Sequence, residues 1–339
     1  MSDFALSCPA PLGESERVLM AHGGGGRLMR ELIEELFAAR LEPQYETDAA
    51  TLAPGGTRLA FTTDSFVVRP IFFPGGDIGS LAVHGTVNDL AMAGAEPVAL
   101  SVAFILEEGL ELETLRRVVD SMAQAARRAG VRIVTGDTKV VERGHADQIY
   151  ITTTGIGVLV HDGELAPWRV APGDELVLSG DIGRHGMAVM SAREGLAFES
   201  AIVSDSAPVH REALGLLENG IRVHCMRDLT RGGLASAVIE IARAARVRVE
   251  LDETRIPVRE DVRAACELLG FDPLYVANEG RFVAFVAEGE GERAAAQLPG
   301  GAVIGKVTET GAGPVTLRSM IGAGRVLDLL SGEQLPRIC

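Results

Sequence analysis

The chain has 339 residues, of which 47% are hydrophobic and 23% are charged, and its formal net charge is −15. This length and composition indicate a globular protein with room for two domains. The negative charge, without any basic tract to offset it, argues against a nucleic-acid partner. No apolar stretch approaches the roughly 20 residues of a membrane span, so no membrane partner is expected.

The four cysteines form no CxxC pair, and the N-terminus carries no apolar run of the kind found in signal peptides. We therefore expect a cytoplasmic protein with reduced thiols. Cys225 and Cys266 lie in apolar stretches and are predicted to be core thiols. With 40 glycines against one Trp and three Tyr, recognition through main-chain contacts at glycine loops is favoured over aromatic stacking.

The first half of the chain mixes strands with long helices. The predicted elements are a helix at 28–39, a strand at 58–68, a helix at 79–93, a buried strand at 98–105, a helix at 112–129, and strands at 132–135 and 148–159. The helix at 112–129 has the apolar spacing of one buried face, at Leu115, Val118, Val119, Met122 and Ala126.

A domain boundary is predicted near residues 163–173, where prolines and glycines interrupt the pattern. The second half then repeats the order of the first, with predicted strands at 175–179, 247–251, 281–286 and 303–307 and helices at 186–194, 209–218, 234–244, 259–269 and 291–297. We predict α+β domains at 41–165 and 166–330, behind a glycine-rich loop and helix at 1–40. Residues 331–339 have no periodicity and are predicted to form a mobile tail.

Four consecutive glycines, Gly23, Gly24, Gly25 and Gly26, precede the first predicted helix. Their amides could wrap phosphate oxygens with the help of the helix dipole. The spacing is not that of a Walker A loop, and a flexible linker is the alternative interpretation.

Carboxylates follow in two of the predicted elements of the first domain. Asp64 is predicted to lie at a strand end between hydroxyl residues, which suits a Mg²⁺ ligand, although a turn or cap is the alternative. Asn88 and Asp89 lie in an apolar helix, where burial requires either an ion or a hydrogen-bond network.

Three further polar groups are candidates for a site. Asp137, Thr138 and Lys139 are predicted at the exit of a strand, where sites are commonly built, or else in a surface turn. Asp228, Arg231 and Gly232 are predicted to form a second ion or phosphate site, with an N-capping turn as the alternative. Glu279 is a candidate general base, and a surface residue without a role is the alternative.

The last residue is a cysteine, Cys339. A terminal thiol can swing on its backbone into more than one pocket, which suits a carrier of a covalent group. Its own α-carboxylate should raise the thiol pKa unless a cation offsets this charge. A frayed and silent terminus is the alternative.

Taken in this order, the motifs resemble the HypE family of [NiFe]-hydrogenase maturation proteins, a branch of the aminoimidazole ribonucleotide synthetase-like (PurM-like) ATP-binding superfamily. The resemblance extends from the glycine loop to the last residue. It rests on 22–26, 63–65, 84–95, 136–141, 228–233, 278–280 and the terminal Pro336-Arg337-Ile338-Cys339.

The resemblance implies an N-terminal sheet that pairs with its twin in a barrel-like homodimer, and a C-terminal α+β domain that closes over an ATP cleft. It implies that a carbamoyltransferase, HypF, loads Cys339 with a carbamoyl group. ATP-dependent dehydration then leaves a thiocyanate, and the cyano group passes to iron on a HypC–HypD complex.

The same resemblance assigns roles to individual residues. ATP would contact Gly23 to Gly26, Asp64, Asn88, Asp137, Thr138, Asp228, Arg231 and Gly232. Mg²⁺ would be held by Asp64, Asp89 and Asp137, with Asn88 beside them, and the catalytic residues would be Cys339, Lys139 and Glu279.

Two alternatives remain open. One is another PurM-like enzyme that phosphorylates an amide or a selenide without using the tail. The other is a non-catalytic scaffold for hydrogenase assembly factors. Removal of Cys339 should abolish the turnover of a tail carrier but not that of an enzyme acting on a free substrate. A scaffold should hydrolyse no ATP under any condition.

Overall fold

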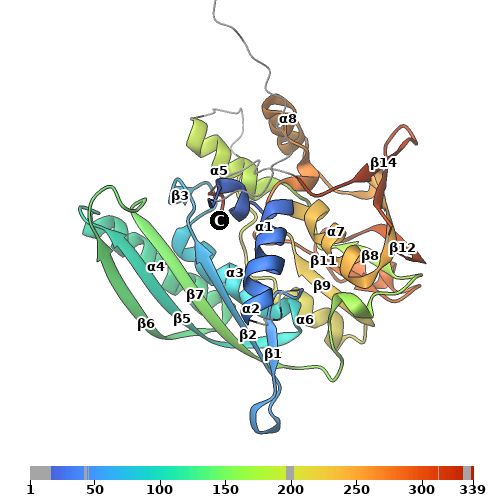
Figure 1. Ribbon diagram of the computed structural model, residues 1–339, viewed down its shortest axis with the longest axis horizontal. Helices are drawn as coiled ribbons and strands as arrows, with labels where there is room; N and C mark the ends of the chain where they lie inside the picture. Colours follow the sequence, from blue (N-terminus) through green and yellow to red (C-terminus); the bar gives the residue numbers. More distant parts are fainter. Residues whose placement is uncertain (1–16, 42–43, 45, 196–201, 312, 331–336) are drawn as a thin grey trace, which may run out of the picture.

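The structure is a computed structural model, which describes residues 17–41, 44, 46–195, 202–311, 313–330 and 337–339. It has two sheets, each with helices against it, and a helical N-terminal segment in front of the junction between them (Figure 1). That segment comprises α1 (Arg27–Leu32), a π-helical turn (Ile33–Ala38) and α2 (Ala39–Leu41). No helix in the described ranges is long and apolar enough to span a membrane.

The N-terminal domain has a five-stranded sheet in the order β1-β2-β7-β5-β6. These strands are β1 (Ala50–Leu52), β2 (Leu59–Phe66), β5 (Ala95–Glu107), β6 (Arg132–Val141) and β7 (Ile149–Leu159), and a small ribbon is formed by β3 (Phe72–Phe73) and β4 (Gly76–Asp77). Helices α3 (Ile78–Met92) and α4 (Leu112–Ala129) bury its inner face. The outer face of the sheet carries no helix in the described part of the chain (Figure 1).

Helix α3 begins at a capping box, in which Asp77 Oδ1 accepts from the N–H of Gly79 over 2.8 Å and Ser80 Oγ accepts in return from the N–H of Asp77. The helix is buried on nearly every side because it lies between the sheet, α4 and the second domain. Polar side chains on such a helix need partners, which makes its Asn88 and Asp89 informative.

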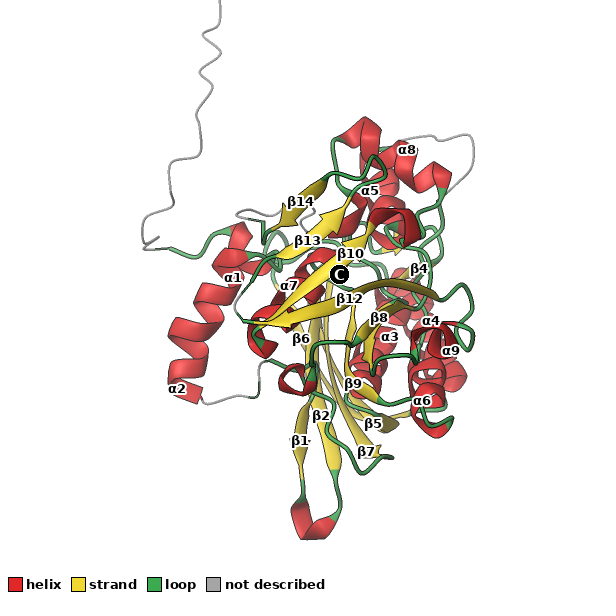
Figure 2. Cartoon of the chain, turned by 90° about the vertical axis from the view of Figure 1, so that its right-hand side faces the viewer, coloured by secondary structure: helices red, strands yellow, loops and turns green. Residues whose placement is uncertain are grey.

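The C-terminal domain has a seven-stranded sheet in the order β14-β13-β10-β12-β8-β11-β9 (Figure 2). Its strands are β8 (Glu175–Leu178), β9 (Val223–Asp228), β10 (Val247–Asp252), β11 (Phe282–Val286), β12 (Ala302–Thr310), β13 (Val315–Arg318) and β14 (Gly324–Leu327). The helices are α5 (Arg184–Glu194), α6 (His210–Glu218), α7 (Gly233–Ala245), α8 (Glu260–Leu269) and α9 (Gly291–Ala295).

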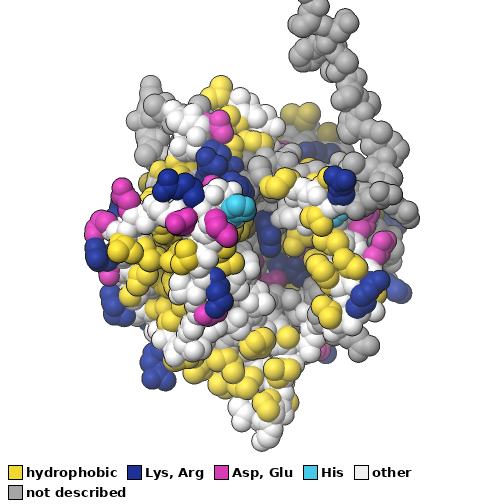
Figure 3. All heavy atoms as spheres, turned by 60° about the vertical axis from the view of Figure 1, so that its left-hand side comes forward, with side chains coloured by type: hydrophobic (Ala, Val, Ile, Leu, Met, Phe, Trp, Pro, Cys, Tyr) yellow, Lys and Arg dark blue, Asp and Glu magenta, His cyan; other side chains and the backbone are white. Residues whose placement is uncertain are grey.

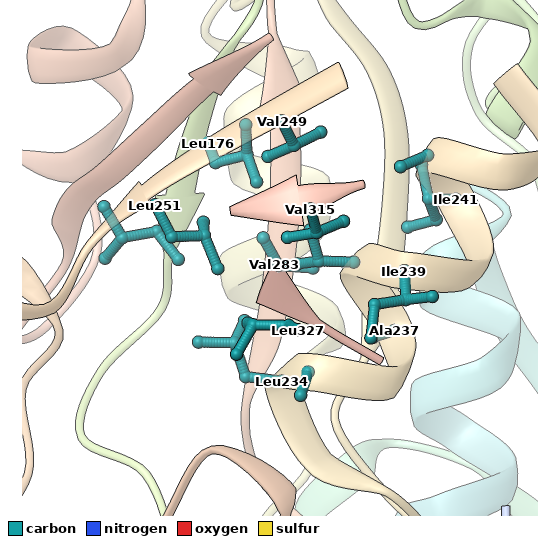
Figure 4. Packing of buried hydrophobic residues seen from close by; sticks show 14 of the residues in the cluster. Leu176, Leu234, Ala237, Ile239, Ile241, Val249, Leu251, Val283, Val315 and Leu327 are labelled. Atoms are coloured by element: carbon teal, nitrogen blue, oxygen red, sulfur yellow. The ribbon is translucent and has the colours of Figure 1, made fainter. Parts of the chain in front are cut away.

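Helix α7 packs on one face of this sheet and α6 and α9 on the other. Leu234, Ala237 and Ile241 of α7 face Val283 and Val315 of the strands, as Figure 4 shows. The spacing of these α7 residues by three and four positions places them on one helix face.

Most predicted elements are confirmed, including the two α+β domains, and α4 has the predicted bounds. Two details are wrong. Val119 is 43% exposed and lies off the buried face of α4, and the strand predicted at 98–105 extends over all of β5 with Val98 and Ile105 exposed. Strands β1, β3, β4, β9, β13 and β14 were not predicted, since five of them have only two to four residues and the buried positions of β9 do not alternate regularly.

Candidate active site

Two cavities meet where the domains join, and Arg231 lines both of them. The first has a volume of about 310 Å³ and the second of about 320 Å³. The first holds the carboxylates of Asp48, Asp64, Asp89 and Asp228, and the second holds Gly23, Gly24 and the terminal Cys339. Figure 3 shows a hollow near the centre of this face of the molecule, with basic and acidic side chains inside it.

Both domains supply the carboxylates of the first cavity. Asp64 points to the inner face of β2, Asp89 comes from α3, and Asp228 is the last residue of β9. The hydroxyl of Thr62 donates to Asp89 Oδ2 over 2.7 Å. The fold therefore brings these three aspartates to one cavity, while their roles as ligands stay predictions.

Burial raises the pKa of each of these carboxyl groups, and repulsion from neighbouring carboxylates raises it further for Asp48, Asp89 and Asp228. The pKa of Asp48 is raised to about 6, and the pKa values of Asp89 and Asp228 lie well above the usual range. The pKa of Asp64 is also raised by burial, while the charge of Arg231 acts against the shift. A cavity with these properties favours a ligand that brings positive charge to the carboxylates.

No three His, Cys, Asp or Glu side chains in the described ranges are close enough to hold a metal ion by themselves. Asp48 Oδ2 is buried without a hydrogen-bond partner and lines this cavity. Mg²⁺ is commonly held by one or two carboxylates together with phosphate oxygens and water. The arrangement therefore fits a metal ion that arrives with a polyphosphate, with Asp64 and Asp89 as its ligands.

The glycine loop packs against Arg231 and the root of the tail. Gly25 has a φ of +72°, and a Cβ there would lie 2.9 Å from the main chain of Arg231. A Cβ on Gly26 would lie 2.4 Å from the carbonyl oxygen of Leu330. Arg231 in turn donates to the carbonyl of Gly23 over 3.2 Å. The absence of side chains at 25 and 26 thus permits close approach of the loop to the wall between the cavities.

Glu279 is 2% exposed, so the alternative that it is a surface residue is wrong. Burial raises its pKa well above the usual range, and the carboxylates of Asp228, Asp205 and Asp64 add to this shift. Its N–H donates to Asp205 Oδ2 over 3.2 Å, while its own Oε1 has no hydrogen-bond partner. A buried carboxyl with a raised pKa and an unsatisfied oxygen is suited to accept a proton from a ligand.

Cys339 is docked at the site. An oxygen of its α-carboxylate accepts from the N–H of Val67 over 3.1 Å, directly after β2, and Ile338 is buried in the N-terminal core. Burial raises the pKa of the thiol to about 12, with Arg231 acting against the shift and Glu279 and Asp64 adding to it. The predicted mobility of the tail stays a prediction, since residues 337–339 are described in one docked position and residues 331–336 lie outside the described ranges. The dominant cause of the pKa shift is burial rather than the α-carboxylate that the sequence suggested.

Asn88 joins the domains through its side-chain amide. Its Oδ1 accepts from the N–H of Val209 over 2.8 Å, and its Nδ2 donates to the carbonyls of Ala207 and Glu279 over 3.1 and 3.3 Å. Because its oxygen and nitrogen both have main-chain partners, the structural network that the sequence left open is the better account of this residue.

Asp137, Thr138 and Lys139 lie within β6, an exposed edge strand, so the prediction that they follow a strand is wrong. The register places Asp137 beside Ala103 and Thr152 on the outer face of the sheet, whereas Asp64 faces inward. Lys139 Nζ is paired with Asp137 over 2.7 Å. One chain alone therefore does not bring these residues into the cavity of Asp64.

Three residues of the site were missed from the sequence. Arg227 is buried and paired with Asp48 over 2.8 Å and with Glu240 over 2.9 Å, which links the domains beside the cavity. Asp205 holds the main chain of Glu279. A signal for Arg227 was present, because a charged residue in the otherwise apolar run before Asp228 requires a buried partner. Asp48 and Asp205 have no comparable signal.

The fold and the site define a two-domain protein of the AIR synthase related class. Residues 46–159 match the family described as AIR synthase related protein, N-terminal domain, and residues 171–318 match the corresponding C-terminal domain. These matches correspond to the two sheets described above.

Full-length relatives narrow the class. The chain is 50% identical over 335 residues to the carbamoyl dehydratase HypE of Rhodobacter capsulatus, with 96% of this chain and 98% of the relative covered. It is similar to a crystal structure of HypE in complex with ATP (TM-score 0.81, 47% identity, 95% of this chain and 100% of the other). It is also similar to HypE in a HypE–HypF complex (TM-score 0.83, 45% identity, 88% and 99%). The chain belongs to the HypE family of carbamoyl dehydratases, which act in hydrogenase maturation.

Proposed function

We propose that this protein binds ATP with Mg²⁺ and dehydrates a carbamoyl group on Cys339 to a thiocyanate, which supplies the cyanide ligand of a [NiFe]-hydrogenase iron. The observation that carries the proposal is the position of the terminal cysteine, which lines a cavity with Arg231 and is influenced by the charges of Glu279, Asp64 and Asp228. A carrier thiol and a buried proton acceptor thus lie together beside a cavity suited to a metal-bound polyphosphate.

The chemistry follows from the weakness of a carbonyl oxygen as a leaving group. The γ-phosphoryl group of ATP is transferred to the carbonyl oxygen of the thiocarbamate, which releases ADP. Phosphate then leaves with the C–O bond electrons, the two N–H protons are lost, and S–C≡N remains. Glu279 takes up a nitrogen proton, and Arg231 stabilises the negative charge on the transferred group.

The nucleotide is held from both domains. Asp64 and Asp89 bind Mg²⁺, which cancels the repulsion between the triphosphate and the acidic cavity. Gly23 to Gly26, Asp228, Arg231 and Gly232 contact the nucleotide around the cavity wall. Asp137 and Thr138, also assigned to the nucleotide, and Lys139, assigned to catalysis, take part from a second copy of the chain.

This contribution from a second copy requires a homodimer, which forms through the N-terminal sheet. The ten-residue strand β6 pairs with β5 on one side and has no strand partner on the other in the described part of the chain, and Val134 and Val140 on it are 55% and 67% exposed. Phe61, Ile105 and Ile156 add exposed apolar area on the neighbouring strands. Long exposed edges of this kind pair readily with another chain.

The carrier role requires the tail to leave the site for its partners. A HypF carbamoyltransferase loads the thiol, and a HypC–HypD complex receives the cyano group, each outside the cavity. The reaction takes place in the cytoplasm, where the carrier thiol stays reduced.

The decisive experiment is the intact mass of the loaded protein before and after addition of ATP with Mg²⁺. We expect a loss equal to one water, located in the C-terminal peptide. Removal of Cys339 should abolish turnover, whereas an enzyme that phosphorylates a free amide or selenide would keep it. An unchanged mass of the loaded protein in the presence of ATP hydrolysis would contradict the proposal.

A further inference from the structure

Helix α5 of the C-terminal domain contacts the main chain of the tail at two places. The ring nitrogen Nε2 of His185 lies 2.9 Å from the carbonyl oxygen of Ile338. One guanidinium nitrogen of Arg193 donates to the carbonyl of Arg337 over 2.6 Å and to the carbonyl of Arg69 over 2.7 Å. The two α5 residues therefore hold consecutive carbonyls, directly before Cys339.

The His185 ring is fixed in one orientation. It is fully buried, and Phe73 packs edge-on against it with ring centroids 5.3 Å apart. Nδ1 lies 2.8 Å from Ser204 Oγ. Because the Ile338 carbonyl can only accept, Nε2 carries the proton and Nδ1 accepts from the Ser204 hydroxyl. Burial lowers the pKa of His185, which agrees with this neutral tautomer.

The N-terminal domain holds the other side of the tail. The N–H of Val67 donates to an α-carboxylate oxygen of Cys339 and the N–H of Arg69 to the carbonyl of Arg337, each over 3.1 Å, which is strand-like pairing. Asp147 forms ion pairs with the side chains of both Arg69 and Arg337. The last three residues are thus bound between two domains, mostly through main-chain atoms.

We propose that His185 and Arg193 are positioning residues that receive the carrier tail and set the place of the Cys339 sulfur beside Arg231 and Glu279. This inference rests on the proposed function for its consequence in catalysis, but not for the binding itself. The two residues recognise carbonyls that any cargo on the sulfur leaves unchanged. The same two contacts therefore accept the free, the carbamoylated and the cyanated tail.

The binding is tested on the full chain by the rate at which iodoacetamide alkylates Cys339, followed by mass mapping of the C-terminal peptide. In the docked tail Cys339 is only partly exposed and burial raises its thiol pKa to about 12, so the undocked thiol should react faster. Loss of one buried hydrogen bond should raise the undocked fraction, and with it the rate, about tenfold in Arg193→Ala or His185→Ala. His185→Gln keeps both a donor and an acceptor and should stay near the wild-type rate.

Arg116→Ala, which removes an exposed arginine paired only locally with Glu113, is the matched control and should leave the rate unchanged. Arg193→Ala keeps the test valid if the buried His185→Ala fails to fold. Equal alkylation rates in Arg193→Ala and wild type would overturn the proposal. If Cys339 of the wild-type protein is protected from alkylation but the loaded tail is not dehydrated, the proposed function is overturned and the proposed tail contacts are retained.

Dehydration of the loaded tail gives a second, separate readout. The variants that alkylate faster should dehydrate the carbamoylated tail more slowly in a single turnover, while their affinity for ATP stays at the wild-type value. A fall in ATP affinity of similar size would show that α5 supports the fold of the nucleotide cavity, and this result would also overturn the positioning role.

Discussion

Arg231 and Cys339 line the same cavity, and the charge of Cys339 is the largest influence that raises the pKa of this arginine. The same guanidinium acts against the rise that burial causes in the pKa of the thiol and of Asp64. One cation therefore serves both the carrier tail and the carboxylates. Without it, the end of the tail would lie among buried acidic groups with no opposite charge nearby.

We predict that Arg231→Gln blocks the dehydration step and leaves loading intact. Loading takes place with the tail outside the cavity, whereas the phosphorylated intermediate requires the cation inside it. Loss of one charge-stabilising donor should slow dehydration about 100-fold or more. Intact mass during turnover should show the carbamoylated form accumulating. Arg231→Lys should regain part of the rate, and turnover of Arg231→Gln at the wild-type rate would contradict this role.

The pH dependence of dehydration should report Glu279. Its pKa is raised well above the usual value for a glutamate, chiefly by burial, so the proton stays on this carboxyl to a higher pH than on an exposed glutamate. The rate should therefore fall as the pH drops through this raised pKa. A single-turnover pH profile of the loaded protein is the measurement, and Glu279→Gln should lose about 100-fold or more above that pKa and lack this acid limb. An acid limb at the ordinary glutamate pKa would assign the base elsewhere.

Much of the fold could be predicted from the sequence, because its helices and long strands are periodic. The gathering of Asp64, Asp89, Asp228 and Glu279 could be anticipated only through a family resemblance, since these residues are far apart in sequence. The position of Asp137 was not predictable, because the face of a strand depends on register, and one residue of offset reverses it.

The docking of the tail was also beyond the sequence. Residues 337–339 have no periodicity, and their binding depends on main-chain carbonyls that every sequence has. The partners that recognise them, such as His185, look like ordinary core residues until the fold is known. Asp48 was missed for a similar reason, because only its pairing with Arg227 across the domain junction marks it as part of the site.

We predict that Asp64→Asn stabilises the protein without nucleotide and weakens its response to ATP with Mg²⁺. The raised pKa of Asp64 means that its charge opposes folding, increasingly as the pH rises through that pKa. The substitution removes this repulsion, and it also removes a proposed metal ligand. Thermal unfolding at neutral pH should show an equal or higher Tm without ligand and a smaller rise on addition of ATP with Mg²⁺. Ser65→Ala, at an exposed position of the same strand that lines neither cavity, is the control and should respond like wild type.

Mixed dimers test whether Lys139 acts across the subunit boundary. Lys139 lies on the outer face of the sheet, away from the cavity of its own chain, so its proposed catalytic role requires a second copy. Lys139→Ala and Glu279→Gln should each be inactive as homodimers. When the two are unfolded together and refolded, half of the dimers are mixed, and each mixed dimer has one site with an intact Glu279 and the partner's intact lysine.

Such a mixture should therefore recover roughly a quarter of the wild-type dehydration rate. The control is Glu279→Gln refolded with Arg231→Gln, two substitutions on the cavity side of the same chain. Because both residues serve their own subunit's site, every site in a mixed dimer of this pair lacks one of them. A site with both intact would form only if the two residues acted in different subunits. Activity in the Lys139 mixture and none in the Arg231 mixture would place the lysine in the neighbouring subunit's site. If neither mixture recovers activity, Lys139 has no role in the neighbouring subunit's site, and its exposed ion pair with Asp137 is its only interaction that the structure supports.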